Sequence, residues 1–85
     1  MTAQNNINEL QFQVMIEGDA AENDFIAYIP ALRLGARGET LAEVRENAKD
    51  LLLMELEARI RDGRGIPADN NAKMEMIQIS LPVTK

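Results

Sequence analysis

Residues 40–63, TLAEVRENAKDLLLMELEARIRDG, decide the fold because they predict a single long helix. Thr40 and Glu43 have the spacing of a capping box, in which each side chain bonds a backbone N–H that the helix start leaves without a partner. No glycine or proline follows until Gly63, which suits a left-handed helix stop. Such a helix is about 33 Å long, close to the diameter of about 30 Å of a compact chain of this size. We therefore expect it to cross the whole molecule.

Three strands are predicted ahead of this helix. Residues 10–17 largely alternate between apolar and polar side chains, which is the period of a half-buried strand. Residues 18–24 are small and acidic, which favours a hairpin turn into a second strand at residues 25–29. The second strand is apolar on both faces and needs cover on both, and Pro30 ends its regular pairing because proline lacks an N–H. A short third strand is expected at residues 34–37.

After the helix, the pattern predicts a loop at residues 63–71 and a last strand at residues 74–81, with Ile77, Ile79 and Leu81 on one face. The fold class is therefore α+β, with the order β-β-β-α-β and one long helix on one face of a small sheet. Residues 1–9 are polar, and we expect a flexible N-terminal tail there. Residues 10–85 are expected to form one domain, since 85 residues leave no room for a second.

Two missing residue types narrow the classes of function. The chain has no cysteine, which excludes disulfides, thiolate nucleophiles and cysteine-bound metals. It also has no histidine, which is the usual general base and a common zinc ligand. The composition therefore argues against most enzymes. We expect no catalytic residue, no cofactor, no small-molecule substrate and no metal site.

The overall composition is that of a soluble globular domain, with 27% charged and 46% hydrophobic residues. No apolar run approaches the length of a membrane span. No basic and then apolar leader opens the chain. We therefore expect no membrane association and a cytoplasmic location.

The excess negative charge lies in the first third of the chain. The net charge is −5, yet residues 1–32 hold five acidic residues and no Lys or Arg, while the remainder holds nine of each sign. Nucleic-acid binding needs clustered Lys and Arg, so we expect no direct binding of RNA or DNA. An acidic region instead attracts a basic protein and speeds their encounter. The alternative is that the charge only keeps a small protein soluble.

The helix carries more apolar surface than one face of a sheet can cover. One stripe is expected to face the sheet, and it consists of Leu41, Val44, Ala48, Leu51 and Leu52. Burying one further Leu or Met side chain is worth about 1.5–3 kcal/mol, which favours a homo-oligomer, either a dimer or a tetramer. The alternative is that the last strand or the polar tail covers this surface. The expected oligomer interface consists of Ile26, Leu53, Met54, Ala58 and Ile60.

Five short stretches occur in a telling order: FQVMIE at 12–17, AYIPAL at 27–32, GETLAE at 38–43, ENAK at 46–49 and DGRGIP at 62–67. In order and spacing they resemble the HicB-like family of bacterial and archaeal antitoxins. Members of that family show a V-x-I-E strand, an A-Y-x-P-x-L-x-G strand end, a G-[DE]-T-x-x-E-A helix start and a D-G-x-x-I-P loop. The resemblance covers residues 10–81. It departs from the family at Asp24-Phe25, where a D-G pair is usual, and in the segment 30–40, which is about one residue short.

The resemblance implies a partial ribonuclease-H-like α+β domain whose last strand lies parallel beside the first. It implies an antitoxin that binds a small basic HicA-type toxin, an mRNA-cleaving ribonuclease, and occludes its active site. The acidic first third of the chain suits such a partner independently of the resemblance. Longer family members add a DNA-binding module, and we expect none in the four residues that follow Leu81.

Candidate site residues are few. The expected partner-binding residues are Glu17, Asp19, Glu22, Asp24 and Tyr28. The carboxylates lack the spacing of a calcium-binding loop, which favours a solvated hairpin or a partner contact over a metal site. Glu17 and Glu75 would meet only if the first and last strands pair, which keeps a metal-dependent nuclease remnant as a minor alternative. Tyr28 could stack on a nucleic-acid base, but it is interpreted as a core or interface residue. The alternative function of the chain is that of an orphan oligomeric domain that binds RNA or DNA directly.

Overall fold

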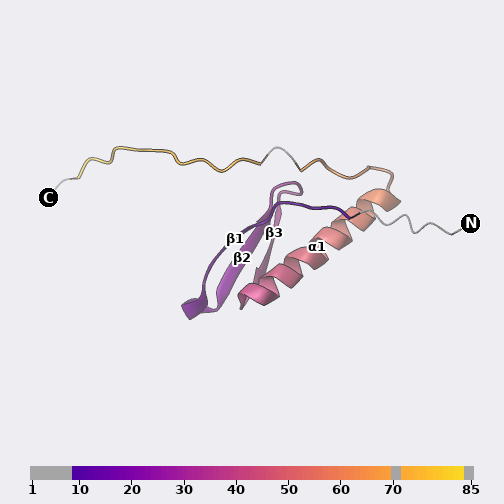
Figure 1. The fold of residues 1–85 in the computed structure, drawn as a ribbon, viewed down its shortest axis with the longest axis horizontal. Helices are drawn as coiled ribbons and strands as arrows, with labels where there is room; N and C mark the ends of the chain where they lie inside the picture. Colours follow the sequence, from indigo (N-terminus) through magenta and orange to yellow (C-terminus); the bar gives the residue numbers. More distant parts are fainter. Residues whose placement is uncertain (1–8, 70–71, 84–85) are drawn as a thin grey trace, which may run out of the picture.

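The computed structural model describes residues 9–69 and 72–83 and confirms the α+β class (Figure 1). Its elements follow in the order β1 (Met15–Asp19), η1 (Ala20–Glu22), β2 (Asp24–Ile29), β3 (Leu34–Gly38) and α1 (Leu41–Arg61). The three strands form one antiparallel sheet in the order β1-β2-β3, and α1 packs against β2 and β3. The expected flexible tail lies almost wholly outside the described residues, as do residues 70 and 71 of the expected loop.

The strands pair as two successive hairpins. Met15 faces Tyr28 and Asp19 faces Asp24 across the first hairpin, while Phe25 faces Gly38 across the second. β1 begins at Met15, not at Leu10 as the alternating pattern predicts, and it runs on through Asp19. The register explains the late start, because residue 13 would face Pro30, which has no N–H to offer to the ladder.

The first hairpin turns through η1. The carboxylate of Asp19 accepts a hydrogen bond from the backbone N–H of Ala21 at 2.9 Å, and so caps this short helix. Asn23 then takes a left-handed conformation with φ 51°, which asparagine tolerates better than most residues. The acidic residues of this segment are therefore turn-forming residues as well as charges.

Helix α1 begins and ends as the sequence predicts. Thr40 Oγ1 accepts from the N–H of Glu43 at 3.0 Å, and Glu43 Oε1 accepts in turn from the N–H of Glu39 at 2.7 Å, one residue ahead of the cap. At the other end Gly63 has φ 73°, and the N–H of Arg64 donates to the carbonyl of Arg59 at 2.8 Å. These bonds make a Schellman stop, in which the left-handed residue is most easily a glycine.

The core is small and lies between the sheet and the first half of α1. It consists of Ala27, Ile29, Leu32, Val44 and Ala48. Gly38 lets β3 and the helix start approach closely, because a Cβ at this position would lie 2.6 Å from the backbone nitrogen of Val44. Leu51 and Leu52 pack at the edge of this core, whereas Leu41 is largely exposed. The expected stripe on α1 is thus buried only in its middle.

The last predicted strand, residues 74–81, is not present in the structure. This segment is extended but has no strand partner among the described residues. It passes the start of β1 and then continues away from the sheet (Figure 1). The radius of gyration is accordingly 17.9 Å, against about 12 Å for a compact chain of this length. The alternating pattern is that of a strand, but no strand edge runs alongside the segment to supply the ladder bonds.

Candidate protein-binding surface

The face of the sheet opposite α1 is uncovered over much of its area. Successive side chains of a strand point to opposite faces, and Ala27 and Ile29 are fully buried toward the helix. Their neighbours on β2, Ile26 and Tyr28, therefore lie on the other face, which we call the open face. Met15 stands directly across from Tyr28 in the register. These three large apolar side chains are 37–48% exposed, and together they form an exposed apolar patch on one face of the sheet.

One end of the open face is strongly acidic. The acidic hairpin, as we call it, consists of Glu17, Asp19, Glu22 and Asp24, and these residues surround a shallow hollow floored by Gly18 and Ile26. The ion pairs found within the described ranges are Asp62–Arg64 and Lys73–Glu75, so none of the four carboxylates has a cationic partner there. Like charges held together without partners repel one another and attract a cationic surface.

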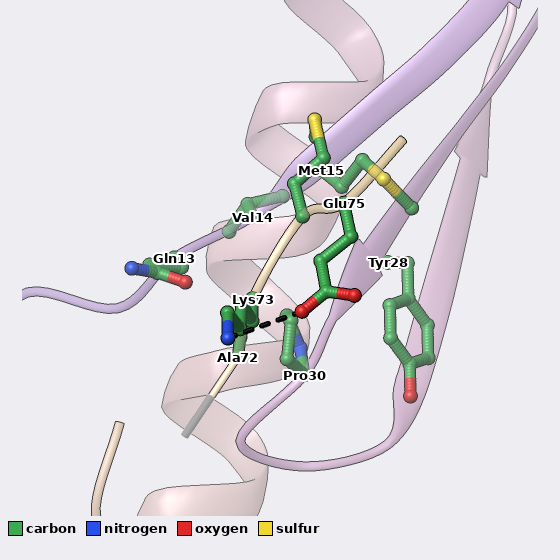
Figure 2. Close-up of a pocket in the computed structure, with 9 residues that line it drawn as sticks. Gln13, Val14, Met15, Tyr28, Pro30, Ala72, Lys73 and Glu75 are labelled. Carbon is green, nitrogen blue, oxygen red and sulfur yellow. Dashed lines mark ion pairs between the residues drawn. The ribbon is translucent and has the colours of Figure 1, made fainter. Parts of the chain in front are cut away.

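The other end of the open face is apolar and partly enclosed. Figure 2 shows the hollow formed there by the start of β1, by Tyr28 and Pro30, and by residues 72–75 passing over them. The Lys73 ammonium and the Glu75 carboxylate form an ion pair of 3.1 Å at its rim, and both side chains are exposed. An exposed pair of this kind contributes little to stability.

A single strong hydrogen bond ties the chain after α1 to the start of β1. The backbone N–H of Gln13 donates to Asp69 Oδ2 at 2.6 Å. The second carboxylate oxygen of Asp69 is buried without a partner among the described residues. Because a charge-assisted bond is stronger than a neutral one, this contact fixes where the following segment, residues 72–75, meets the sheet.

The structure brings together four of the five predicted partner-binding residues. Glu17, Glu22 and Asp24 line one hollow with Asp19, whereas Tyr28 lines the apolar hollow at the opposite end of β2. Asp24 and Tyr28 are four positions apart on β2, a distance of about 13 Å. The predicted set therefore occupies the two ends of one face and does not form one cluster.

The predicted oligomer interface falls on two different sides of the molecule. Leu53, Met54 and Ile60 are exposed on the second half of α1, with half-buried Ala58 among them. Ile26 lies on the open face, on the far side of the sheet from the helix. A single flat contact cannot include both groups, so each is a separate candidate surface.

Sequence reasoning did not identify Met15, Pro30 or residues 72–74 as part of a binding surface. The signal for Met15 was available, because it sits on the outward side of the alternating stretch 10–17. Its pairing with Tyr28 depends on the register, which the unusual hairpin through η1 sets. The contribution of residues 72–75 depends on the chain path after α1, for which the sequence offers no local rule.

Among the described residues, no three Asp or Glu side chains are grouped so that they could hold one metal ion, the acidic hairpin included. The Glu75 carboxylate, which the sequence pairs with Glu17 only if the first and last strands lie together, is paired with Lys73 instead. None of the helices in the described part of the chain is long and apolar enough to cross a bilayer. The open face therefore presents negatively charged carboxylates beside exposed apolar side chains.

A scan against models of protein families, a search of curated proteins and a search of solved structures each returned no match to this chain.

Proposed function

We propose that this chain is a non-catalytic protein-binding domain that neutralises a small basic HicA-type toxin, an mRNA-cleaving ribonuclease, by occluding its active site. The observation that carries the proposal is the acidic hairpin, whose four carboxylates stand beside an exposed apolar face and have no cationic partner in the described residues. The ordered sequence stretches that resemble HicB-like antitoxins support the same function.

The charge pattern suits a ribonuclease as the partner. An enzyme that cleaves RNA must present cationic groups to the phosphate backbone, because phosphate neutralisation supplies much of the affinity for nucleic acid. The carboxylates of Glu17, Glu22 and Asp24 line one hollow and offer clustered negative charge that can occupy such a surface in place of RNA. Complementary charge of this kind accelerates association and fixes orientation.

The apolar part of the open face supplies surface that can be buried on binding, which charge alone does not. Met15, Ile26 and Tyr28 are exposed side by side on neighbouring strands. Aromatic and methionine side chains are enriched at the centres of protein interfaces, where their burial provides most of the binding energy. An acidic rim next to such a centre is the arrangement expected of a protein-binding surface.

Direct binding of RNA or DNA is the alternative function, and the open face gives it little support. Arg37, which faces Ile26 across β2 and β3, is the cation that the strand register places on this face. The acidic hairpin at its end would repel a phosphate backbone. This alternative predicts binding of nucleic acid that weakens steeply with salt, in the absence of any protein partner.

The test is protection of mRNA from a purified HicA-type toxin. Adding the chain is expected to leave the mRNA uncut and to give a complex at micromolar concentrations in low salt. The variant Glu17→Gln, Glu22→Gln, Asp24→Asn is expected to slow association at least tenfold and to flatten its salt dependence. Asp19 is left intact because it caps η1.

The matched control removes three exposed carboxylates from α1: Glu46→Gln, Asp50→Asn and Glu57→Gln. It has the same net charge as the hairpin variant and is expected to protect mRNA as the wild type does. An equal loss of mRNA protection in both variants would mean that binding depends on the net charge of the chain and not on the acidic hairpin. Absence of any complex with the wild-type chain would contradict the proposed function.

A further inference from the structure

The most exposed apolar side chains among the described residues belong to the segment at the C-terminal end of the chain. We call residues 72–83 the tail. Met76 is 98% exposed and Ile77 is 81% exposed, and Ile79 and Leu81 are exposed to a similar degree. Figure 1 shows the tail running past the sheet and beyond it, and the longest dimension of the molecule is 76 Å against 28 and 23 Å for the others. Exposing so much apolar surface to water is unfavourable.

The tail has the pattern of a strand that is apolar on one side along most of its length and on the other side only near its start. Ile77, Ile79 and Leu81 share one side, and Met74 and Met76 share the other. A segment of this kind is stabilised when it joins the edge of a sheet. Its backbone then forms hydrogen bonds with the edge strand, and its side chains extend the two faces of the sheet.

Strand β1 offers such an edge. It is the first strand of the order β1-β2-β3, and no strand pairs with its outer side within residues 9–69 and 72–83. Ile16 of β1 packs against the core, while Met15 lies on the open face. A strand added beside β1 would extend both layers. Its isoleucine side would continue the core next to Ile16, and its methionine side would continue the open face next to Met15.

The chain path favours the β1 edge of a second copy over the chain's own edge. The bond from Gln13 N to Asp69 Oδ2 holds the chain just ahead of the tail beside the residues that precede β1, and the tail then leaves the sheet instead of turning along it. Each copy thus presents the unpaired outer edge of β1 and, in its tail, an unpaired strand-like segment. In two copies related by a twofold axis, the tail of each copy can pair with β1 of the other, because the contacts of a twofold dimer are reciprocal.

Charge does not oppose this association. The chain has a net charge of −5, but the tail holds one Lys and one Glu, which already pair with each other. The acidic hairpin lies at the opposite end of β1 from the apolar hollow where the tail arrives. The tail can therefore approach a second copy without bringing like charges together.

We propose that two copies of this chain exchange their tails, each tail joining β1 of the other copy as a fourth strand. The exchange does not depend on the proposed ribonuclease partner. It would add Met74 and Met76 to the open face beside Met15, and so enlarge the apolar centre of the protein-binding surface. Pairing with sheet edges is a common mode of association between protein chains.

The molar mass in solution tests the exchange. Light scattering is expected to give twice the chain mass of 9.5 kDa for the wild type, and the mass of one chain for Ile77→Asp with Ile79→Asp, because an added strand cannot bury two unpaired carboxylates. The matched control is Leu53→Asp with Ile60→Asp on α1, which is expected to keep the double mass. A monomeric wild type overturns the proposal, and so does a dimer that only the α1 pair dissolves.

Crosslinking then distinguishes exchange between chains from closure within one chain. The chain has no cysteine, so Met15→Cys and Met76→Cys can be made as two single-cysteine variants at exposed positions. A mixture of the two, treated with a flexible bifunctional thiol reagent, is expected to give a covalent product containing one of each chain. Mixing Leu53→Cys with Met76→Cys is the control and is expected to give little product. A double variant, Met15→Cys with Met76→Cys, that crosslinks only within one chain contradicts exchange.

These outcomes are separable from those of the proposed function. A monomeric chain that still protects mRNA would overturn the exchange and leave the antitoxin function standing. An exchanged dimer that binds no toxin would do the reverse.

Discussion

Residues 12–19 and residues 74–81 are similar in length and in their alternation of apolar and polar side chains, yet only the first segment lies in a sheet. The first is joined to β2 by a short hairpin and meets its partner locally. The second follows the whole length of α1 and meets only the start of β1. The comparison teaches that an alternating pattern indicates a strand with one face to bury. Whether that strand pairs depends on which strand edge the chain path brings alongside it.

The sharpest way to test this difference is to place a charge in each region. Val44→Asp is expected to unfold the domain, because Val44 is fully buried in the core and an unpaired buried carboxylate is strongly destabilising. The total stability of a chain of this size is only about 4–13 kcal/mol. Met76→Asp is expected to leave the urea midpoint of a dilute sample unchanged, because Met76 has almost no contacts there. Circular dichroism in urea measures both, and equal losses would mean that the tail belongs to the folded unit of the single chain.

A smaller effect is expected where β3 meets α1. Gly38→Ala places a Cβ 2.6 Å from the backbone nitrogen of Val44, so the strand or the helix start must move. We expect a loss of about 1–3 kcal/mol, measured by urea unfolding. Gly35→Ala, whose Cβ would lie 3.0 Å from the carbonyl oxygen of Ala27, is the comparison and should cost less. The reverse order would mean that the sheet edge is more tightly packed than the junction of sheet and helix.

The smallest of the three effects is expected at the helix cap. Thr40→Ala removes the acceptor for the N–H of Glu43 and is expected to cost about 1 kcal/mol in urea unfolding. Thr40→Ser keeps the oxygen and is expected to retain most of the stability. A serine variant as weak as the alanine variant would show that the threonine methyl, not the hydrogen bond, stabilises the start of α1.

The well-predicted parts of the fold are those that local rules determine. The capping residues Thr40 and Gly63 set the bounds of α1, and Pro30 sets the end of β2, because each acts through its own backbone or the adjacent turn. The start of β1 was missed, since it depends on where Pro30 falls in the register of a hairpin with an inserted η1. The last strand is predicted at residues 74–81 but is not formed in the structure, because pairing with β1 requires a neighbour that sequence periodicity does not supply.

The candidate surface was likewise predicted only where its residues are close in sequence. The acidic residues from Glu17 to Asp24 are close in sequence, and the hairpin keeps them close in space. Tyr28 was identified as an interface residue, but its neighbours Met15 and Pro30 depend on the register and on the path of residues 72–75. The grouping of Ile26 with the α1 residues ignored the sheet that lies between them.

The central claim is that the tail and the open face are surfaces made for other chains. Amide hydrogen exchange, measured on the wild-type chain in dilute and in concentrated solution, tests it most directly. The amides of residues 25–29 are expected to be protected in both samples, and those of residues 74–81 only in the concentrated one, where copies associate. Rapid exchange of residues 74–81 at every concentration, with toxin absent or present, would contradict the claim.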